Sequence, residues 1–354
     1  MTLAFVTATP LEVTRGSGTF RGIHTLARAL GRLGVGVRWA TPRLPLPIFT
    51  LRRLLFNERL RWLGAPEADV VVGFDMDGYR IAGRGRSPHV ASIKGVIADE
   101  MRFERGWTRA SMALQAACES LHVRRADLVV TTSRYAASRI RALYGLESEP
   151  AVVPELIDLE EWRSLLARQQ VPRDESRFTV LAVGRFYPRK RLSVLLQAAG
   201  LLRERIPGFR LRIVGGGPEE RRLRRLARQL GLEGSVRWLG NVSQEQLARE
   251  YNRADVFCLP SVQEGFGIVF LEAMAAGKPI VAARAAAVPE VVPQGLLVEP
   301  EDPEALSDAL ERVCRDTHLR RQLVEQGLEL VEQYDAPRVA GRFLDLVHGL
   351  VGGR

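Results

Sequence analysis

Short apolar runs alternate with helical periodicity along the whole chain. Between the first two runs, Phe20, Ile23, Leu26 and Leu30 recur at the spacing of three and four residues that marks an amphipathic helix. Runs of this length separated by helices predict parallel strands in a doubly wound α/β sheet. The strands predicted in the first half are Leu3–Ala8, Val35–Ala40, Ala68–Phe74, His89–Ile93, Ala126–Thr131 and Ala151–Val153.

The same rhythm restarts after a charged stretch near residues 158–176. This half contains several helix-start signals. Ser243 and Gln246 have the spacing of a capping box, and Asp302 stands before a proline that suits a first helical turn. Gly231 is placed to end a helix that begins at Pro218. The strands predicted here are Phe178–Val183, Phe209–Val214, Val236–Leu239, Ala254–Leu259, Pro279–Ala282 and Leu296–Val298.

The pattern therefore predicts two Rossmann-like domains in tandem, and 354 residues suit two domains of ordinary size. We place the first domain at residues 1–160 and the second at 161–335. The remaining segment, 336–354, is predicted as a helix that packs back on the first domain. Such sheets bind ligands outside the carboxyl ends of their strands, so two sheets that face each other would share one cleft.

Composition narrows the class of protein. No stretch of 18 apolar residues could span a membrane, and the start MTLAFVTATP predicts a buried strand rather than a signal peptide, so we expect a cytoplasmic protein. The three cysteines are far apart and fit buried apolar positions in a reducing compartment. The net charge of +10 comes mostly from dispersed arginines, which favours a solvated basic surface or an anionic partner over nucleic acid.

The most informative stretch is the nonapeptide from Glu264 to Glu272. A spacing of eight residues turns a helix through roughly 800°, so the two acids cannot share one helix face. We expect Glu264 in a loop and Glu272 in the helix that follows. Gly265 and Gly267 leave backbone amides open beside a helix N-terminus, which favours anions. Carboxylates for sugar hydroxyls and amides for a phosphate together predict a nucleotide-sugar pocket.

A basic segment follows the first strand of the second half. Gly184 ends that strand, so Arg185 and Lys190 project from the turn beyond it. Two such cations would bind a diphosphate and stabilise the negative charge that grows on a leaving group. Taken alone, both could be ordinary surface cations. Their occurrence in one domain with the acidic nonapeptide favours the diphosphate interpretation.

Two glycine-rich turns are weaker signals. Gly16 and Gly18 lie between the first strand and the first helix, where their backbone could approach a ligand. Gly215 opens the Gly-Gly-Gly-Pro turn after another strand. A purely structural turn is an equal alternative for each.

Together these residues resemble the family 4 retaining glycosyltransferases of the GT-B fold. In the second half of the chain the resemblance is nearly continuous. In the first half it concerns mainly the order of strands and helices. The stretches that carry it are Val183–Lys190, Gly215–Pro218, Ala254–Pro260 and Glu264–Pro279, with weaker echoes at Gly16–Gly18, Ser133, Pro289–Val291 and Gly295–Ala305.

The resemblance implies specific roles. Arg185 and Lys190 would bind the donor diphosphate, Glu272 the ribose hydroxyls and Glu264 the donor sugar. Further donor contacts would come from the backbone of Gly16, Gly18, Gly184, Gly215, Phe266, Gly267 and Ile268.

The sequence departs from the family pattern at three places. Lys94 stands where a histidine is usual, Glu155 begins the segment that is usually Asn-Gly-Ile-Asp, and Ala286 and Ala287 replace a usual Gly-Gly. Lys94 could donate to a sugar or acceptor hydroxyl, or stabilise developing phosphate charge. The alternative is chance, or a structural ion pair with Asp99 or Glu100.

Metal chemistry is not expected. Asp75 and Asp77 form an Asp-x-Asp pattern, but they belong to the first domain, and two cations already serve the diphosphate. A role for either aspartate at the acceptor stays open. His24 and His89 are interpreted as structural, and no cofactor is predicted beyond the nucleotide-sugar substrate.

The segment Leu51–Leu63 is basic and amphipathic. It could lie on the inner membrane face beside a lipid-linked acceptor, although a solvated helix over the first sheet is favoured.

The implied activity is metal-independent, retaining transfer from a nucleoside-diphosphate sugar, UDP favoured over GDP, to a hydroxyl acceptor. A lipid-linked or saccharide acceptor in glycan, glycolipid or cell-envelope polysaccharide synthesis is expected. Alternatives are an epimerase or phosphorylase of the same fold, or a non-catalytic sugar-nucleotide sensor.

Overall fold

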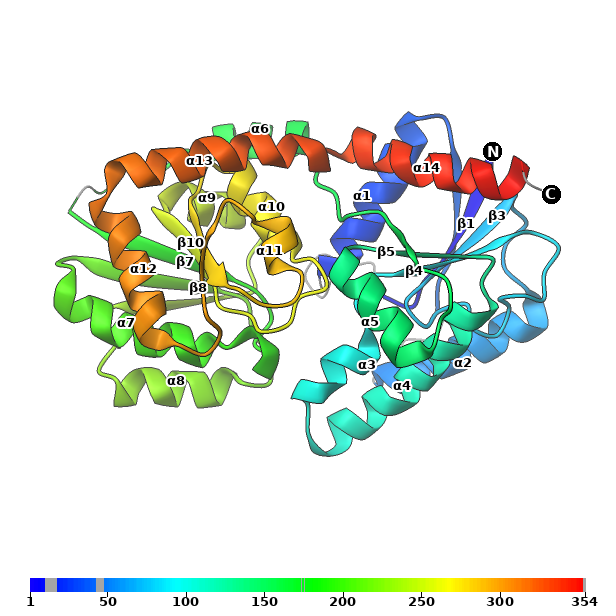
Figure 1. The fold of residues 1–354 in the computed structure, drawn as a ribbon, viewed down its shortest axis with the longest axis horizontal. Helices are drawn as coiled ribbons and strands as arrows, with labels where there is room; N and C mark the ends of the chain where they lie inside the picture. The colour runs from blue at the N-terminus through cyan, green and yellow to red at the C-terminus, as the bar shows by residue number, and fades with distance from the viewer. Residues whose placement is uncertain (10–17, 43–47, 173, 175, 353–354) are drawn as a thin grey trace. The chain divides into compact units, whose positions relative to one another are not determined.

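The computed structural model describes residues 1–9, 18–42, 48–172, 174 and 176–352. The chain forms two compact units (Figure 1). Unit 1 comprises Met1–Leu156 together with Ala336–Arg354, and unit 2 comprises Ile157–Asp335.

Unit 1 is built on a parallel six-stranded sheet of order β2-β1-β3-β4-β5-β6. Its strands are β1 (Thr2–Val6), β2 (Gly36–Ala40), β3 (Val70–Phe74), β4 (His89–Ile93), β5 (Leu128–Thr131) and β6 (Ala151–Val152). Its helices are α1 (Gly18–Arg32), α2 (Phe49–Leu63), α3 (Ile97–Glu100), α4 (Gly106–Arg125), α5 (Arg134–Tyr144) and α14 (Ala336–Gly352), with a 3-10 turn η1 (Met101–Phe103).

Alternating residues of the central strands face two separate cores, because successive side chains of a strand point to opposite faces. Leu3 and Phe5 of β1 pack with α1 and α14 in one core. Ala4 and Val6 pack with α2 in the other. Helices therefore cover both faces of the sheet, which is why its strands are apolar throughout.

The last helix, α14, belongs to unit 1 although the preceding 179 residues, Ile157–Asp335, form unit 2. Val339, Phe343 and Val347 are buried in the same core as Ile23 and Leu26 of α1. Their spacing places one apolar stripe of α14 against α1.

Unit 2 repeats the architecture with a parallel sheet of order β12-β11-β10-β7-β8-β9. The strands are β7 (Phe178–Val183), β8 (Phe209–Val214), β9 (Val236–Gly240), β10 (Val256–Leu259), β11 (Ile280–Ala283) and β12 (Leu296–Val298). The helices are α6 (Leu159–Arg168), α7 (Leu192–Arg205), α8 (Glu220–Gln229), α9 (Gln244–Arg253), α10 (Ile268–Ala275), α11 (Val288–Val291), α12 (Pro303–Arg315) and α13 (Thr317–Val331), with 3-10 turns η2 (Pro188–Lys190) and η3 (Glu332–Tyr334).

The predicted helix signals have their expected partners. Ser243 and Gln246 form a complete capping box at the start of α9. The Asp302 side chain accepts a hydrogen bond from the Ala305 amide and so caps α12. Gly231 follows α8 in the left-handed conformation, at a φ of 64°.

Two global expectations can be compared with the described part of the chain. None of its helices is both long enough and apolar enough to cross a bilayer. Cys118 and Cys258 are buried and Cys314 is partly buried, and all three thiols are free.

Candidate functional site

The loops at the carboxyl ends of β7 and β8 in unit 2 are held together by their backbones. The Phe186 amide donates to the Gly216 carbonyl at 3.0 Å, and the Glu219 amide donates to the Phe186 carbonyl at 3.1 Å. A Cβ atom on Gly215 would overlap the Gly184 carbonyl, and one on Gly217 would lie 2.7 Å from the Phe186 nitrogen. Gly215 also has a φ of 120°, so glycine is required there on both counts.

A buried ion pair lies at this edge of the sheet. The Lys190 ammonium, from the 3-10 turn η2 after β7, lies 2.5 Å from the Glu264 carboxylate in the loop after β10. Their side chains are only 13% and 7% exposed. The loops themselves are also joined, because the Val262 amide donates to the Arg189 carbonyl at 2.9 Å. The structure thus brings together two of the four charged residues that the sequence selected in this domain.

Glu264 also lies beside the start of α10. Gly267 precedes this helix in the left-handed conformation, at φ 91° and ψ 71°, and no side chain caps the helix there. A Cβ on Gly267 would lie 2.7 Å from the Phe270 ring and 3.7 Å from the Glu264 carboxyl carbon. The amides at the start of α10, with Ile268 as its first residue, therefore lie next to the ion pair and favour an anion.

Glu272 is in the second turn of α10, and Glu264 is in a loop, as predicted. The Tyr251 hydroxyl donates to Glu272 Oε2 at 3.0 Å, and the Trp162 indole donates to the Glu272 carbonyl at 3.1 Å. Glu272 is buried, and its partner Tyr251 belongs to no motif of the sequence. Phe266, also buried, packs its ring edge-on against Tyr334, with ring centroids 5.5 Å apart.

Three other residues are predicted to contact the donor: Arg185, Gly18 and Gly16. The Arg185 side chain is exposed and forms no ion pair with any residue that the structure describes. Gly18 is the first residue of α1 in unit 1. Gly16 lies outside the described residues.

Lys94 forms a buried ion pair in unit 1. Its ammonium lies 3.3 Å from Glu155 Oε1, and the two side chains are 6% and 8% exposed. The alternative that paired Lys94 with Asp99 or Glu100 was therefore wrong about the partner. Asp99 instead accepts hydrogen bonds from Tyr135, Arg102 and Arg139. Two of the departures from the family pattern, at positions 94 and 155, thus contact each other.

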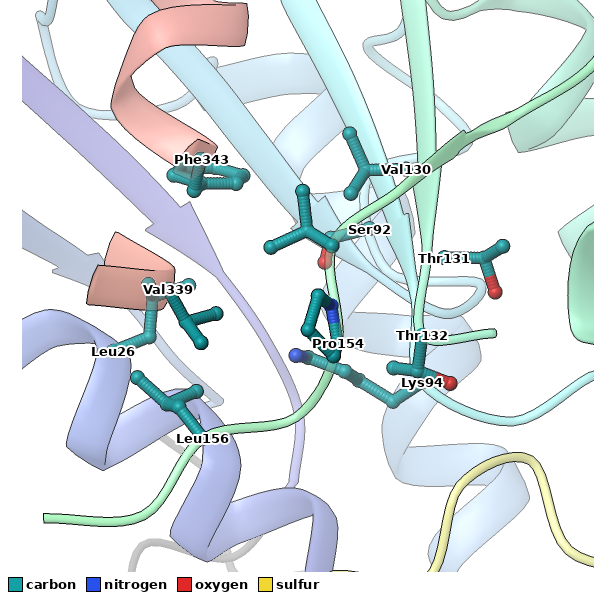
Figure 2. A pocket seen from close by; sticks show the side chains of 11 residues that line it. Leu26, Ser92, Lys94, Val130, Thr131, Thr132, Pro154, Leu156, Val339 and Phe343 are labelled. Carbon is teal, nitrogen blue, oxygen red and sulfur yellow. The ribbon is translucent and has the colours of Figure 1, made fainter. Parts of the chain in front are cut away.

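Glu155 is accommodated by a glycine inside α1. A Cβ on Gly22 would overlap Glu155 Oε2, an atom that is buried and accepts no hydrogen bond from the described residues. A small cavity of about 10 Å³, room for one water molecule, lies beside Lys94. Figure 2 shows the Lys94 ammonium next to Pro154 in this cavity, with Ser92 and Thr132 among the polar lining residues.

The two aspartates after β3, Asp75 and Asp77, accept hydrogen bonds from other residues of unit 1. Asp77 is fully buried and forms a bidentate pair with Arg53 of α2, both contacts being 3.1 Å. Its Oδ2 also accepts from the Ala8 amide at 2.7 Å, at the end of β1. Asp75 has a φ of 52° and accepts from the Lys94 amide at 2.8 Å. Burial raises the pKa of Asp75 to about 6. Among the described residues no group of three or more His, Cys, Asp or Glu side chains is placed to hold a metal ion.

His89 and His122 form a buried pair beneath Asp75. Their Nε2 atoms are 2.8 Å apart, and His122 Nδ1 donates to the Asp75 carbonyl at 2.5 Å. Burial lowers the pKa of His122 to about 4, and burial together with His122 lowers the pKa of His89 as well. Both rings are therefore neutral near pH 7, and they support the fold of the Asp75–Asp77 turn.

The loop in which alanines replace the usual glycines carries backbone strain. Ala286 has a φ of 51°, a left-handed conformation that L-residues rarely adopt. The adjacent Ala287 amide donates to the Glu264 carbonyl at 3.3 Å. The loop therefore supports the backbone of Glu264, and the structure explains why glycine is suited to position 286.

Glu155, Tyr251 and Arg53 are the site residues that the sequence analysis missed. Glu155 had one usable signal, since it was recognised as a departure, and a buried carboxylate needs a cation. Neither Tyr251 nor Arg53 belongs to a motif, and their partners, Glu272 and Asp77, are 21 and 24 residues away in sequence.

Family models match both halves of the chain. The family model described as "Glycosyl transferases group 1" matches residues 165–330, and the model "Glycosyltransferase Family 4" matches residues 16–161. A GDP-mannose-dependent alpha-(1-6)-phosphatidylinositol monomannoside mannosyltransferase of Mycobacterium tuberculosis is 30% identical over 279 residues, which cover 73% of this chain and 71% of the relative. A D-inositol 3-phosphate glycosyltransferase of Saccharomonospora viridis is 35% identical over 243 residues, 63% of this chain and 56% of the relative.

Solved structures share the fold at lower identity. Sucrose-phosphate synthase from Thermosynechococcus elongatus superposes with a TM-score of 0.84 at 22% identity, covering 100% of both chains. Anabaena HepE in complex with UDP-glucose superposes with a TM-score of 0.75 at 18% identity, covering 99% of this chain and 100% of HepE. At these identities the likeness concerns the fold alone.

The strain at Ala286 leads to a stability prediction. Ala286→Gly should raise the free energy of unfolding by about 1 kcal/mol, because glycine adopts this φ without a steric penalty. Urea unfolding measures the change. The neighbouring Ala285→Gly is the matched control, and it should lower the same free energy by about 0.5–1 kcal/mol through the entropy of the unfolded chain. Equal effects at both positions would contradict strain at Ala286.

The histidine pair leads to a prediction about pH. The lowered pKa of His122 means that the unfolded chain binds its proton more tightly, so stability is lost as pH falls from 6.5 through 4. The contribution is about 3 kcal/mol. Asp75 acts oppositely, because its raised pKa removes stability as pH rises from about 4 to 6.

The two contributions can be separated in an Asp75→Asn background. There, the free energy of unfolding from urea titrations should rise steeply between pH 4 and 6.5, and His122→Gln should flatten that rise. Replacing the exposed His24 by glutamine is the control and should leave the slope unchanged. Because burial also lowers the pKa of His89, part of the rise should remain in the His122 variant. A slope that is as steep as in the Asp75→Asn parent would refute the assignment to His122.

Proposed function

The chain belongs to family 4 of the glycosyltransferases and has the GT-B fold, and we propose that it transfers a hexose from a nucleoside-diphosphate sugar to a hydroxyl group of a lipid-linked or saccharide acceptor. Two family models match its two halves, and a curated relative is 30% identical over 73% of the chain.

One observation supports the donor site above all: the buried pair of Lys190 and Glu264 beside the uncapped start of α10. A cation, a carboxylate and helix-start amides in one place suit a phosphorylated polyol. The ammonium and the amides of Gly267 and Ile268 bind phosphate oxygens, while Glu264 accepts hydrogen bonds from sugar hydroxyls.

The other predicted residues complete this site in the proposal. The exposed Arg185 binds the diphosphate without first having to break an ion pair in the described structure. Glu272, oriented by Tyr251, accepts hydrogen bonds from the ribose hydroxyls. Gly184 and Gly215 keep the loops after β7 and β8 close together, and Phe266 contributes its backbone amide.

The chemistry that follows is departure of the nucleoside diphosphate as the acceptor hydroxyl attacks. Arg185 and Lys190 stabilise the charge that develops on the leaving phosphate, which makes a metal ion unnecessary in the proposal. We further propose retention at the anomeric carbon, with the leaving phosphate accepting the hydroxyl proton. Activity in the presence of EDTA and the anomeric configuration of the product test these two points.

The nucleotide and acceptor are proposed from the named relatives. The resemblance favours UDP over GDP, whereas the Mycobacterium tuberculosis relative is named as GDP-mannose-dependent. We therefore place GDP-mannose first and UDP-hexoses second as donors. The names of both curated relatives contain an inositol group, so an inositol-bearing lipid or phosphate is the first acceptor to test.

Donor binding can be measured directly. In thermal shift measurements, the true nucleotide at 100 times its Kd should stabilise the protein by about 2.7 kcal/mol, and GDP, UDP and ADP are compared side by side. Arg185→Ala should abolish most of that shift and lower turnover about 100-fold. Arg237→Ala removes another exposed arginine of unit 2 and should change neither quantity.

The reaction type is tested by the release of nucleoside diphosphate. A transferase releases it in stoichiometric amounts when acceptor is added, whereas an epimerase or a silent sensor does not. Acceptor-independent conversion of the donor, or no conversion with any donor that binds, would sink the proposed function.

We also propose that Lys94 contributes positive charge to the reaction from unit 1. A single substitution is ambiguous, because removing one member of a buried ion pair leaves an uncompensated charge and costs about 3–5 kcal/mol. The variant with both Lys94→Met and Glu155→Met removes the pair and should keep stability within about 1–2 kcal/mol of the parent protein. Its turnover should nevertheless fall at least 10-fold.

The two readouts separate the roles of Lys94. The free energy of unfolding of the double variant reports whether the ion pair as a whole contributes to stability. Turnover reports whether the Lys94 ammonium acts on the reaction. Full turnover in the double variant would restrict Lys94 to neutralising Glu155.

A further inference from the structure

Both strongly exposed tryptophans of the chain lie on one side of unit 1. The sequence contains five tryptophans. Trp62, near the end of α2, is 79% exposed, and Trp107, near the start of α4, is 85% exposed. Side chains of this size usually bury most of their surface, so two such residues on neighbouring helices indicate a binding surface.

Each tryptophan belongs to an apolar stripe that faces solvent. On α2, Leu51, Leu55 and Trp62 fall within about 40° of one another on a helical projection. All three are exposed, whereas Phe56 and Leu60, on another side of the helix, are buried. The helix thus has one apolar side for the core and a second side that faces solvent and is apolar except for Glu58.

The longer helix α4 repeats the arrangement. Trp107, Ala110, Leu114, Ala117 and Leu121 fall within about 80° of one another and are all exposed. The side of α4 that packs on the sheet carries a different set, which includes Ala116 and Val123.

The two stripes point away from the same sheet face. Phe56 and Leu60 of α2 pack on Val71 of β3, and Ala116 of α4 packs in a core with Ala91 of β4. Val71 and Ala91 point to the same face, because Val71 pairs with His89 and Gly73 with Ala91 in the parallel register. In Figure 1, α2 and α4 lie together along the edge of unit 1 opposite α1 and α14.

The two helices also touch each other. The hydroxyl groups of Thr50 and Ser111 are 2.7 Å apart, and Gln115 Nε2 donates to Thr50 Oγ1 at 2.9 Å. These hydrogen bonds join the first turn of α2 to α4, so the two stripes lie on neighbouring helices over one face of the sheet. We call Leu51, Leu55, Trp62, Trp107, Leu114 and Leu121 the α2–α4 surface.

The exposed charges around this surface are predominantly positive. Arg61 of α2 and Arg105, Arg109 and Arg124 at α4 are exposed. The acids of the two helices already have partners: Glu58 pairs with Arg80 and, at 3.9 Å, with Arg61, and Glu119 is buried and bonded to Tyr144. A partner must therefore be apolar at its centre and negatively charged around it.

We propose that the α2–α4 surface docks unit 1 on an anionic lipid bilayer. Apolar stripes with tryptophans enter the boundary between headgroups and acyl chains, while the surrounding arginines attract anionic headgroups. A second copy of the chain would bring two basic surfaces together and is disfavoured by charge repulsion. The inference adds a partner to the transfer reaction and rests on the proposed function only in placing the acceptor at a membrane.

Vesicle co-sedimentation tests this docking. The purified full chain should bind vesicles with about a third anionic lipid at least 10-fold more tightly than neutral vesicles, and salt should weaken binding. Tryptophan fluorescence should shift to the blue as Trp62 and Trp107 leave water. The double variant Trp62→Ala with Trp107→Ala should lose at least 10-fold in vesicle affinity and most of the shift.

The matched control removes exposed apolar side chains elsewhere. Leu143→Ala on α5 and Leu328→Ala on α13 delete groups that are 39% and 37% exposed, and together they should leave vesicle binding unchanged. Circular dichroism verifies that both double variants are folded.

Three outcomes would overturn the proposal. The first is equal affinity for neutral and anionic vesicles, and the second is an equal loss of vesicle affinity in the tryptophan and leucine double variants. The third is a concentration-dependent dimer of the chain that dissociates only when the tryptophans are replaced. Nucleotide thermal shifts are measured on the same variants without lipid. If vesicle binding fails but nucleotide binding is intact, the docking is refuted and the proposed transfer is not. If nucleotide binding fails but vesicle binding is intact, the proposed transfer is refuted and the docking is not.

Discussion

Each unit buries a lysine against a glutamate at the carboxyl edge of its parallel sheet. In unit 2 the pair is Lys190 with Glu264, and in unit 1 it is Lys94 with Glu155. Taking two charges out of water is costly, and their attraction offsets that cost only with good geometry. Such pairs are therefore weak evidence for stability and stronger evidence for a task that needs charge in place.

The use of lysine supports this interpretation. The chain contains only three lysines among 51 basic residues, and the third, Lys278, donates to the Ala254 carbonyl at 2.9 Å. Each lysine points its ammonium at an oxygen atom in a confined place. A compact point charge fits there, whereas a planar guanidinium would demand more room and more acceptors. Among the described residues arginine lies mainly at the surface, including the rim of the α2–α4 surface, although Arg53 is buried in its bidentate pair with Asp77.

The backbone supports the pairs in different ways. Glycine permits close approach in three places: Gly215 against Gly184, Gly267 against Phe270, and Gly22 against Glu155. At Ala286 the chain instead accepts a strained conformation next to Glu264. Strain of this kind persists where the surrounding contacts determine the backbone, and here those contacts include the bond from Ala287 to the Glu264 carbonyl.

The sequence by itself determined the architecture, because periodicity and caps are local. The predicted strands His89–Ile93, Phe178–Val183, Phe209–Val214 and Leu296–Val298 have the observed bounds, and the donor-side motif residues follow the predicted strands. Only the tertiary structure decided which charges meet. Lys94 and Glu155 are 61 residues apart, and nothing local distinguishes Glu155 from Asp99 or Glu100 as a partner. The same holds for the outer side of α4, since a helix with two apolar sides shows no single stripe until the sheet it covers is known.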